Sequence, residues 1–220
     1  MSLASLEREI VSCRACPRLV EWRERVAREK RAAYSGESYW GKPLPGFGDP
    51  EARVVVLGLG PAAHGANRTG RVFTGDRSGE FLFAGLYRSG FASSPVSRER
   101  GDGLELYGLW ISAAVRCAPP QNKPTPAERD ACLPYLSREL KLLHRARVIV
   151  CLGSFAWDAA LRLYGVRPRR KFGHGAEYEV NDGPVLLGCY HVSQQNTFTG
   201  RLTPAMLDDM LARARDLGGC

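Results

Sequence analysis

The sequence predicts an α/β protein of three layers, α/β/α, in which helices cover both faces of a central, mostly parallel four-stranded sheet. Apolar runs of strand length occur at 54–57, 106–115, 147–152 and 184–190. Stretches of helical periodicity separate these runs, an alternation that is typical of a parallel sheet. No internal repeat or low-complexity tract divides the 220 residues, so we expect a single domain over 1–220.

The helical stretches have recognisable limits. Residues 3–30 have helical periodicity that Pro17 interrupts, which predicts two helices or one kinked helix. Residues 125–128, Thr-Pro-Ala-Glu, have the N-cap, proline and glutamate of a helix start, and that helix is expected to reach about residue 144. Further helices are predicted at 80–88, 154–164 and 203–217, and connecting loops at 34–50, 92–104 and 166–176.

Three polar segments follow predicted strands, at 58–76, 116–124 and 191–200. The carboxyl ends of parallel strands lie at one edge of a sheet, and ligands of such sheets bind beyond that edge. We therefore expect these three segments to converge on one cleft.

The composition is that of a globular protein, with 44% hydrophobic and 25% charged residues. No apolar run approaches the roughly 20 residues that span a bilayer. The N-terminus also lacks the apolar core of a signal peptide. We therefore expect a cytoplasmic protein that does not enter the membrane, and we expect it to be a monomer.

The formal net charge of +8 comes from arginine, with 26 Arg and 5 Lys. Arginine binds phosphate groups through two parallel hydrogen bonds, so this balance favours a nucleic-acid partner. The alternative is that the arginines form ion-pair networks within the protein. The candidates for phosphate contacts are Arg68, Arg71, Arg116, Lys123 and residues 167–171.

Seven cysteines in a chain without export signals indicate metal or redox chemistry rather than disulfides. Cys13 and Cys16 form a C-x-x-C pair at the break between the two predicted N-terminal helices. Cys117 and Cys132 lie in polar, proline-flanked sequence and are the other candidate ligands. Their spacing alone favours zinc and a [4Fe–4S] cluster about equally, and four unrelated buried thiols remain an alternative. The remaining cysteines, Cys151, Cys189 and Cys220, are interpreted as two packing residues in strands and one free terminal thiol.

The loop after the first strand, 58–79, contains the densest group of candidate binding residues. Its small residues would let a ligand approach the backbone, whose N–H groups then act as donors. An aromatic ring and polar side chains in the same loop suggest a pocket for a flat, hydrogen-bonding molecule. The alternative is an ordinary strand-to-helix loop.

Taken together, several segments resemble a family 5 (type B) uracil-DNA glycosylase. They are the C-x-x-C start, Pro45-Gly46-Phe47-Gly48-Asp49-Pro50, the loop 58–79, the Cys117–Cys132 spacing and the segment 191–203. The resemblance implies an α/β/α glycosylase fold, a [4Fe–4S] cluster on Cys13, Cys16, Cys117 and Cys132, and removal of uracil from DNA.

The sequence departs from the related family 4 in ways that fit type B. Family 4 members have an acidic residue near the start of the first loop, where residues 58–63 contain no carboxylate. They also have an asparagine before the third cysteine, where residues 113–115 are Ala-Ala-Val, and His-Pro-Ser where residues 191–193 are His-Val-Ser. These differences predict a roomier pocket that also accepts other deaminated bases.

Cleavage of the bond between base and deoxyribose develops negative charge on the base and positive charge on the sugar, and the nucleotide must first be flipped out of the duplex. Phe73 is expected to stack on the flipped base, and His191 to donate a hydrogen bond to the base oxygen that gains charge. Backbone N–H groups of Gly60, Ala62 and Ala63 would add donors, with His64 as a weaker candidate. The alternatives are a core aromatic for Phe73 and a structural histidine for His191.

Asp76 and Asn122 are the candidates for positioning water or countering charge on the sugar. The alternative for Asp76 is a local turn or helix cap. The candidates for DNA contact beyond Arg68 and Arg71 are Gln194, Gln195, Asn196 and Arg201, with Phe198 nearby as an aromatic that could enter the gap left by the flipped base.

Two other functions compete with a repair glycosylase. One is a non-catalytic iron–sulfur protein that binds nucleic acid. The other is a nucleotide-binding redox protein, which the first loop disfavours because its glycines match neither G-x-x-x-x-G-K-[ST] nor G-x-G-x-x-G.

Overall fold

The computed structural model describes residues 2–220 and is built on a six-stranded sheet with the order β1-β3-β2-β4-β6-β5. The four inner strands are parallel, as predicted, and form the centre of the sheet. They are β2 (Val54–Gly58), β3 (Leu109–Ala113), β4 (Val148–Leu152) and β6 (Val185–Cys189). Nearly every residue in them is buried, which explains why each is a continuous apolar run rather than an alternating one.

The prediction of four strands is wrong by two, because a short antiparallel strand lies at each edge. β1 (Phe47–Gly48) pairs with β3, and β5 (Glu177–Glu179) pairs with β6. β1 lies between Pro45 and Pro50, and β5 has glutamates at both ends. Strands of two or three residues at a sheet edge are held by backbone hydrogen bonds, so they need no apolar run that a sequence pattern would reveal.

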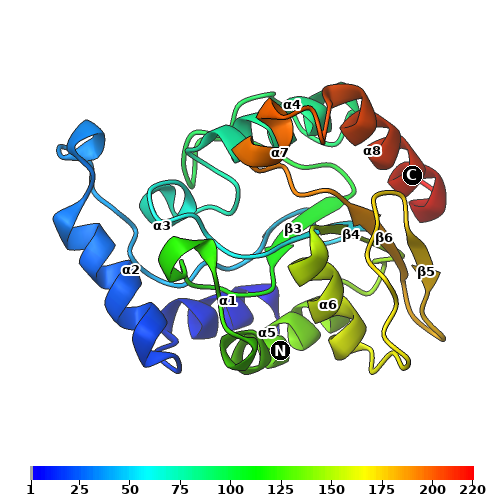
Figure 1. The fold of residues 1–220 in the computed structure, drawn as a ribbon, viewed down its shortest axis with the longest axis horizontal. Helices are drawn as coiled ribbons and strands as arrows, with labels where there is room; N and C mark the ends of the chain where they lie inside the picture. The colour runs from blue at the N-terminus through cyan, green and yellow to red at the C-terminus, as the bar shows by residue number, and fades with distance from the viewer. Residues whose placement is uncertain (1) are drawn as a thin grey trace.

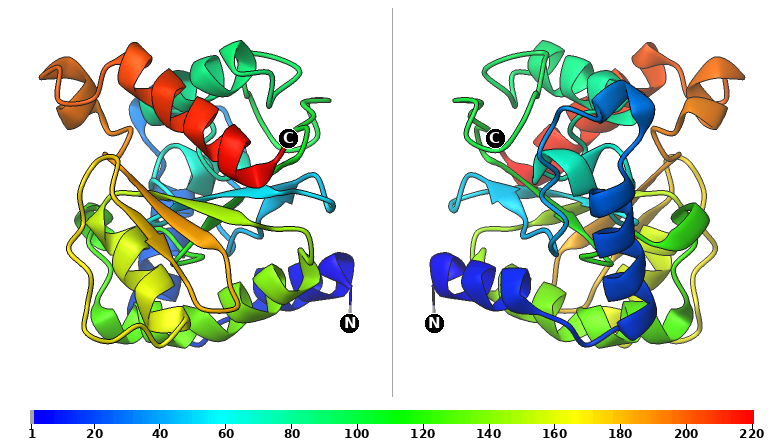
Figure 2. Two further views of the ribbon diagram at one scale, coloured as in Figure 1. Left: turned by 90° about the vertical axis from the view of Figure 1, so that its right-hand side faces the viewer. Right: turned by 90° about the vertical axis from the view of Figure 1, so that its left-hand side faces the viewer.

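Two layers of helices enclose the sheet, as Figures 1 and 2 show. On one face lie α4 (Arg77–Arg88) and α8 (Pro204–Gly218). On the other lie α5 (Pro126–Leu142) and α6 (Ser154–Leu163), with α1 (Leu3–Ser12) packed along α5. Alternate residues of β2 point to opposite faces, so Val54 and Val56 join the first core while Val55 and Leu57 join the second.

The break predicted at Pro17 separates α1 from α2 (Pro17–Glu29), and Cys13 and Cys16 lie at this junction. The predicted helix start at Thr125 is confirmed, because Thr125 and Glu128 form a capping box. Four short helical segments were not predicted. They are η1 (Ala32–Tyr34), α3 (Ala66–Thr69), η2 (Pro120–Asn122) and α7 (Gln194–Phe198).

The order of the parallel strands places a topological switch point between the carboxyl ends of β2 and β4, here called the crevice. From β2 the chain crosses to β3 on one side, and later to β4 and β6 on the other. The connections that leave the carboxyl ends of β2 and β4 therefore turn in opposite directions, and ligands of open α/β sheets bind where this happens. Across residues 2–220, no helix combines the length and apolar character needed to cross a membrane.

Candidate active site

Phe73 and His191 lie together at the crevice, although they are far apart in the sequence. The Phe73 ring packs against the last residue of β2, where a Cβ built on Gly58 would lie 2.6 Å from Cζ of Phe73. His191 follows β6, and its Cβ would lie 3.3 Å from a Cβ built on Gly153, the residue after β4. The centroids of the two rings are 6.2 Å apart. The structure thus brings the predicted stacking ring and the predicted donor to one place.

Phe73 adopts a backbone conformation that side chains rarely adopt, with φ of +53°. Such strain persists only where the surroundings impose it, and it is concentrated at functional sites. Gly79 makes room for this conformation, because a Cβ there would lie 1.9 Å from the carbonyl oxygen of Phe73. Two glycines, Gly58 and Gly79, therefore leave the space that this ring and its backbone occupy.

His191 is an uncharged imidazole at neutral pH. Burial lowers its pKa to about 4. Its backbone carbonyl accepts a hydrogen bond of 2.8 Å from Nδ2 of Asn196 in α7. Asn196 is a predicted DNA contact, and its amide also holds the backbone of His191 through this hydrogen bond.

The segment between β2 and α3 presents free backbone donors. Among residues 2–220, no acceptor pairs with the N–H groups of Gly60, Ala62 or Ala63. Gly60 lies beside the chain that follows β3, since a Cβ there would be 3.2 Å from the carbonyl oxygen of Val115. His64 is less available, because its Nδ1 lies 3.1 Å from the hydroxyl of Tyr39. Burial, together with nearby arginines, lowers the pKa of His64.

Asp76 is the N-cap of α4. One carboxylate oxygen accepts a hydrogen bond of 3.0 Å from the Gly79 N–H. The other oxygen faces Gly65, where a Cβ would lie 2.3 Å from it. Burial raises the pKa of Asp76. The helix cap that was the alternative for Asp76 is therefore present, and it uses one of the two carboxylate oxygens of Asp76.

Asn122 lies at the surface in η2, with φ of +56°. Its backbone N–H donates a hydrogen bond of 3.2 Å to the carbonyl of Pro119. No interaction within residues 2–220 joins Asn122 to Phe73 or His191. The structure therefore does not place Asn122 in contact with these two residues.

An exposed aromatic projects from α7, next to His191 in the chain. Phe198 is 67% exposed, and the guanidinium of Arg77 lies 5.3 Å from its ring centroid. Gln194 and Gln195 are exposed on the same short helix. Arg201 lies 4.7 Å from the ring centroid of Tyr190. Figure 1 shows α7 beside α4.

Three arginines that were candidates for phosphate contact are used inside the protein. Arg71 is buried against Asp102 at 2.7 Å, and Arg116 is buried against Glu139 at 2.6 Å. Arg68 donates to the carbonyls of His64 and Gly75 and is only 12% exposed. We do not propose these three side chains as DNA contacts. The ion pair with Arg71 also ties Asp102, in the loop at 92–104, to the segment after β2.

The four candidate cysteine ligands line one small cavity between α2, α5 and the segment after β3. Cys117 and Cys132 are buried, and Cys13 and Cys16 are half-buried. Within residues 2–220, no three donors are placed to hold a single metal ion. Cys151 and Cys189 are buried within strands and Cys220 is exposed, as predicted.

A buried arginine faces this cavity. The guanidinium of Arg23 in α2 is 2% exposed and donates a hydrogen bond of 2.9 Å to Sγ of Cys117. Its Nε has no partner in the described part of the chain. Burial raises the pKa of the Cys117 thiol to about 12. Sequence reasoning missed Arg23, although a signal existed: it lies seven residues after Cys16 on the same helix face as the apolar Leu19 and Val20.

Other residues of the site were also missed. Gly58 is visible in sequence only as a glycine that ends a strand, which does not reveal the ring packed against it. Nothing in the position of Arg77 in the sequence indicates that its guanidinium would lie beside Phe198. Tyr39 lies in a loop without any periodic pattern.

The family follows from comparison with known proteins. A family model described as the uracil DNA glycosylase superfamily matches residues 45–215, a span that includes the crevice, Phe73 and His191. The chain belongs to this superfamily.

Within the superfamily, its relatives define a narrower class. A protein named type-5 uracil-DNA glycosylase from Mycobacterium tuberculosis is 56% identical over 99% of this chain and 82% of its own length. The type-5 protein of Thermus thermophilus is 54% identical over 96% of this chain and 95% of its own length. A type-4 protein of Archaeoglobus fulgidus is 31% identical over 74% of this chain and 65% of its own length. The chain is thus a member of the type-5 family, as the resemblance implied.

Proposed function

We propose that this protein removes uracil from DNA by hydrolysing the bond between the base and deoxyribose, which leaves an abasic site for repair. The observation that carries the proposal is the pairing of Phe73 with His191 at the crevice between β2 and β4. The names of the type-5 relatives support the same reaction.

The arrangement suits a leaving base that gains negative charge. The flipped base stacks on Phe73, and a ring N–H of His191 donates to the base oxygen on which the charge develops. The free backbone N–H groups of Gly60, Ala62 and Ala63 are further donors near the same strand end. A neutral imidazole is appropriate here, because it stabilises the developing charge without first having to bind a proton in a buried place.

Two further groups are proposed to act on the sugar side. The oxygen of Asp76 that the cap does not use is available to orient water or to face positive charge on the sugar. Asn122 would need DNA to draw its loop toward the crevice. We propose both as auxiliary groups, so that loss of either slows cleavage and does not abolish it.

The pocket is also proposed to accept other deaminated bases. Residues 58–63 supply no carboxylate, and the three residues before Arg116 are the small or apolar Ala113, Ala114 and Val115. A pocket that discriminates by hydrogen bonds to its substrate rejects analogues strongly, whereas one that lacks such side chains discriminates weakly.

The exposed aromatic on α7 is proposed to enter the space left by the flipped nucleotide. Phe198 is the most exposed of the large apolar side chains in the described chain, and Arg77 beside it brings positive charge for the flanking phosphates. Gln194, Gln195 and Arg201 are proposed to contact the DNA around it.

We further propose that Cys13, Cys16, Cys117 and Cys132 hold a [4Fe–4S] cluster. Four thiols that line one cavity supply the ligand set of a [4Fe–4S] cluster, and the resemblance to family 5 favours a cluster over zinc. Arg23 adds a second argument, because its buried guanidinium donates to Sγ of Cys117 at 2.9 Å, whereas the carboxylate of Glu24 lies further away, at 3.7 Å. A metal-bound thiolate at Cys117 would give Arg23 a negative partner. The cluster would join α2 to α5 and is assigned no step in the reaction.

An oligonucleotide with one uracil tests the proposed reaction. Incubation with the protein followed by alkali should cut the strand at the uracil, because alkali breaks DNA at an abasic site. The same oligonucleotide with thymine is the control. Tight binding without cleavage would favour a nucleic-acid-binding protein that lacks the activity.

The ring position of Phe73 can be tested through the glycine beneath it. Gly58→Ala places a methyl group 2.6 Å from Cζ of Phe73, so the ring must move. A displacement of about 1 Å in a reacting group costs up to about 100-fold, and we expect cleavage to slow at least about tenfold while the melting temperature changes little. Gly36→Ala is the control, since nothing lies within 4 Å of that Cβ. An unchanged rate in Gly58→Ala would show that the stacked position of Phe73 does not matter.

The pH dependence of cleavage should reflect the low pKa of His191. Because burial lowers that pKa from 6.5 to about 4, the ring stays neutral from pH 8 down to about pH 5. Single-turnover rates should therefore show no inflection near 6.5, and protonation of His191 should change the rate only as the pH approaches 4. His191→Asn, which keeps a donor and does not titrate, should lack that change on the acid side. An inflection near pH 6.5 that disappears in His191→Asn would contradict a buried neutral imidazole.

A further inference from the structure

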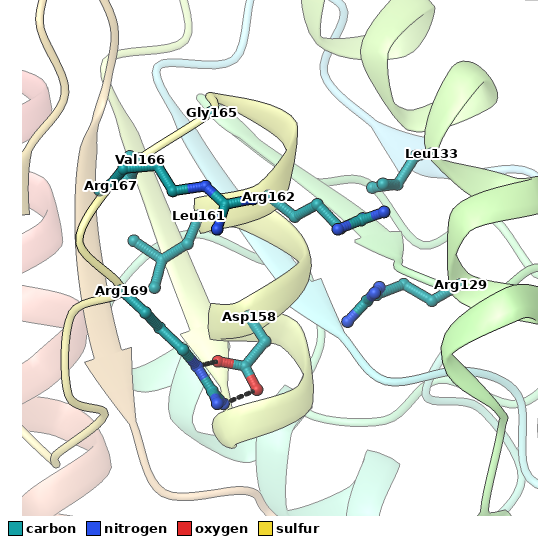
Figure 3. A pocket seen from close by; sticks show the side chains of 9 residues that line it. All are labelled: Arg129, Leu133, Asp158, Leu161, Arg162, Gly165, Val166, Arg167 and Arg169. Carbon is teal, nitrogen blue, oxygen red and sulfur yellow. Dashed lines mark hydrogen bonds and ion pairs between the residues drawn. The ribbon is translucent and has the colours of Figure 1, made fainter.

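The loop that joins α6 to β5 runs back along the helix that it leaves. Arg169 donates two hydrogen bonds to Asp158 in the middle of α6, as Figure 3 shows. One residue later, the carbonyl of Arg170 accepts a hydrogen bond of 3.0 Å from Nε1 of Trp157, nearer the start of the helix. Because α6 begins directly after Gly153, at the carboxyl edge of the sheet, this course returns the loop to that edge.

His174 lies in the returning part of this loop, opposite the residue that precedes His191. β5 pairs with β6 in an antiparallel register, and the same register continued past the start of β5 places His174 opposite Tyr190. In the described chain, the last backbone hydrogen bonds of this ladder are those of Gly188. At the next position the ring of His174 takes the place of a carbonyl, since its Nδ1 accepts a hydrogen bond of 3.3 Å from the N–H of Tyr190. A side chain therefore completes the pairing that the strands leave open.

The ring of His174 is fixed in two further ways. It stacks on Tyr190, with ring centroids 5.0 Å apart and an angle of 23° between the planes. The backbone before it approaches β6 closely, because a Cβ on Gly188 would lie 2.3 Å from the carbonyl oxygen of Gly173. Since Nδ1 accepts a hydrogen bond, this nitrogen carries no proton and the ring is neutral. Burial favours the neutral ring by lowering the pKa of His174, although the carboxylate of Asp209 acts in the opposite direction.

Two side-chain hydrogen bonds thus bracket His191. On one side, the N–H of Tyr190 donates to His174. On the other, Nδ2 of Asn196 donates to the carbonyl of His191 itself. Together they hold the backbone before and after the Cα that carries the imidazole. This precision matters for a group that acts on the reacting base, because a displacement of about 1 Å costs up to about 100-fold in rate.

We propose that His174 is a positioning residue for His191: its ring accepts the N–H of Tyr190 and thereby holds the imidazole of His191 at the crevice. This inference rests on the proposed function, since it takes His191 to be the donor to the leaving base. In this role His174 touches neither the base nor the sugar, and it acts on the rate only through His191.

Two substitutions separate the acceptor of His174 from its ring. His174→Phe keeps a flat ring that can stack on Tyr190 and removes the acceptor, whereas His174→Asn keeps an acceptor oxygen and removes the ring. We expect His174→Phe to slow single-turnover cleavage of uracil-containing DNA about tenfold and His174→Asn to recover most of that loss. DNA binding should be unchanged in both, because no phosphate contact is lost. His144→Phe, at an exposed position, is the control and should cleave like the wild type.

The effect of His174→Phe should depend on His191. In a His191→Ala background the same change should slow cleavage by less than about twofold, because the group that His174 positions is then absent. Equal factors in the two backgrounds would indicate a general structural effect and would overturn the proposal. Loss of rate in His174→Phe without any recovery in His174→Asn would also overturn it, since the ring and not the acceptor would then matter.

Exchange of the Tyr190 amide proton, followed by NMR, tests the hydrogen bond independently of activity. This proton should be protected in the wild type and in His174→Asn, and it should exchange at least about tenfold faster in His174→Phe. Equal exchange in the wild type and His174→Phe would show that the bond is not made. Faster exchange with unchanged cleavage would show that the bond does not position His191. A wild type that has a protected Tyr190 amide and does not cleave uracil-containing DNA would refute the proposed function, and the positioning role with it, while the hydrogen bond itself would stand.

Discussion

Replacing His191 with alanine should slow uracil cleavage by about 100-fold under single-turnover conditions. The imidazole is held at the crevice by burial, by the contact of its Cβ with Gly153 and by the hydrogen bond from Asn196 to its carbonyl. Removal of one preorganised donor to a developing negative charge costs about 10²–10³ in rate. Binding of uracil-containing DNA should change far less, because phosphate contacts dominate that affinity.

Two matched variants make this result specific. His144 is exposed and lies 3.8 Å from the carboxylate of Glu51, and His144→Ala should leave the rate unchanged. His191→Asn keeps an N–H donor of shorter reach and should recover part of the lost rate. An alanine variant that cleaves as fast as the wild type would remove His191 from the mechanism and leave the backbone N–H groups as the only donors.

The second large effect is expected for Cys117→Ala. This change should remove iron and the brown colour with broad absorbance near 400 nm that iron–sulfur proteins show. It should also lower the free energy of unfolding by about 3 kcal/mol or more, because the buried Arg23 guanidinium would lose the cluster-bound thiolate and keep only the longer contact to Glu24. The measurements are iron content, the visible spectrum and chemical denaturation.

Controls separate loss of a ligand from loss of any thiol. Cys220→Ser, at an exposed terminal position, should keep iron content and stability. Wild-type protein that is colourless and contains zinc would overturn the cluster assignment and leave the four thiols as a different metal site. Wild-type protein without any metal, combined with unchanged stability in Cys117→Ala, would show that the four cysteines are packing residues.

Much of the fold could be predicted from local pattern. The four inner strands are buried on both faces, so each one is a short apolar run in the sequence. Helical segments separate one run from the next. The edge strands β1 and β5 could not be predicted, because their pairing uses backbone groups that every residue has. The same holds for α3 and α7, whose four or five residues are too few to show a period.

The candidate site, like the fold, could be predicted from the sequence only in part. Phe73 and His191 could be brought together from sequence because both follow strands whose carboxyl ends share an edge. The roles of Arg68, Arg71 and Arg116 could not be assigned from sequence. The residues around a loop arginine do not show whether its side chain faces solvent or a buried carboxylate. Asp76 and Asn196 show the same limit, because one caps a helix and the other holds a carbonyl.

By itself, the sequence determined the class of the protein: a parallel α/β sheet, four cysteines in a recognisable spacing and polar loops at the strand ends. The tertiary structure alone decided which polar side chains remain available to a ligand. The physical reason is that burial periodicity is a local property of the chain, whereas the partner of a charged or amide group is chosen by residues that are distant in sequence and close only after folding. Asp102 for Arg71, Glu139 for Arg116 and Cys117 for Arg23 are partners of this kind.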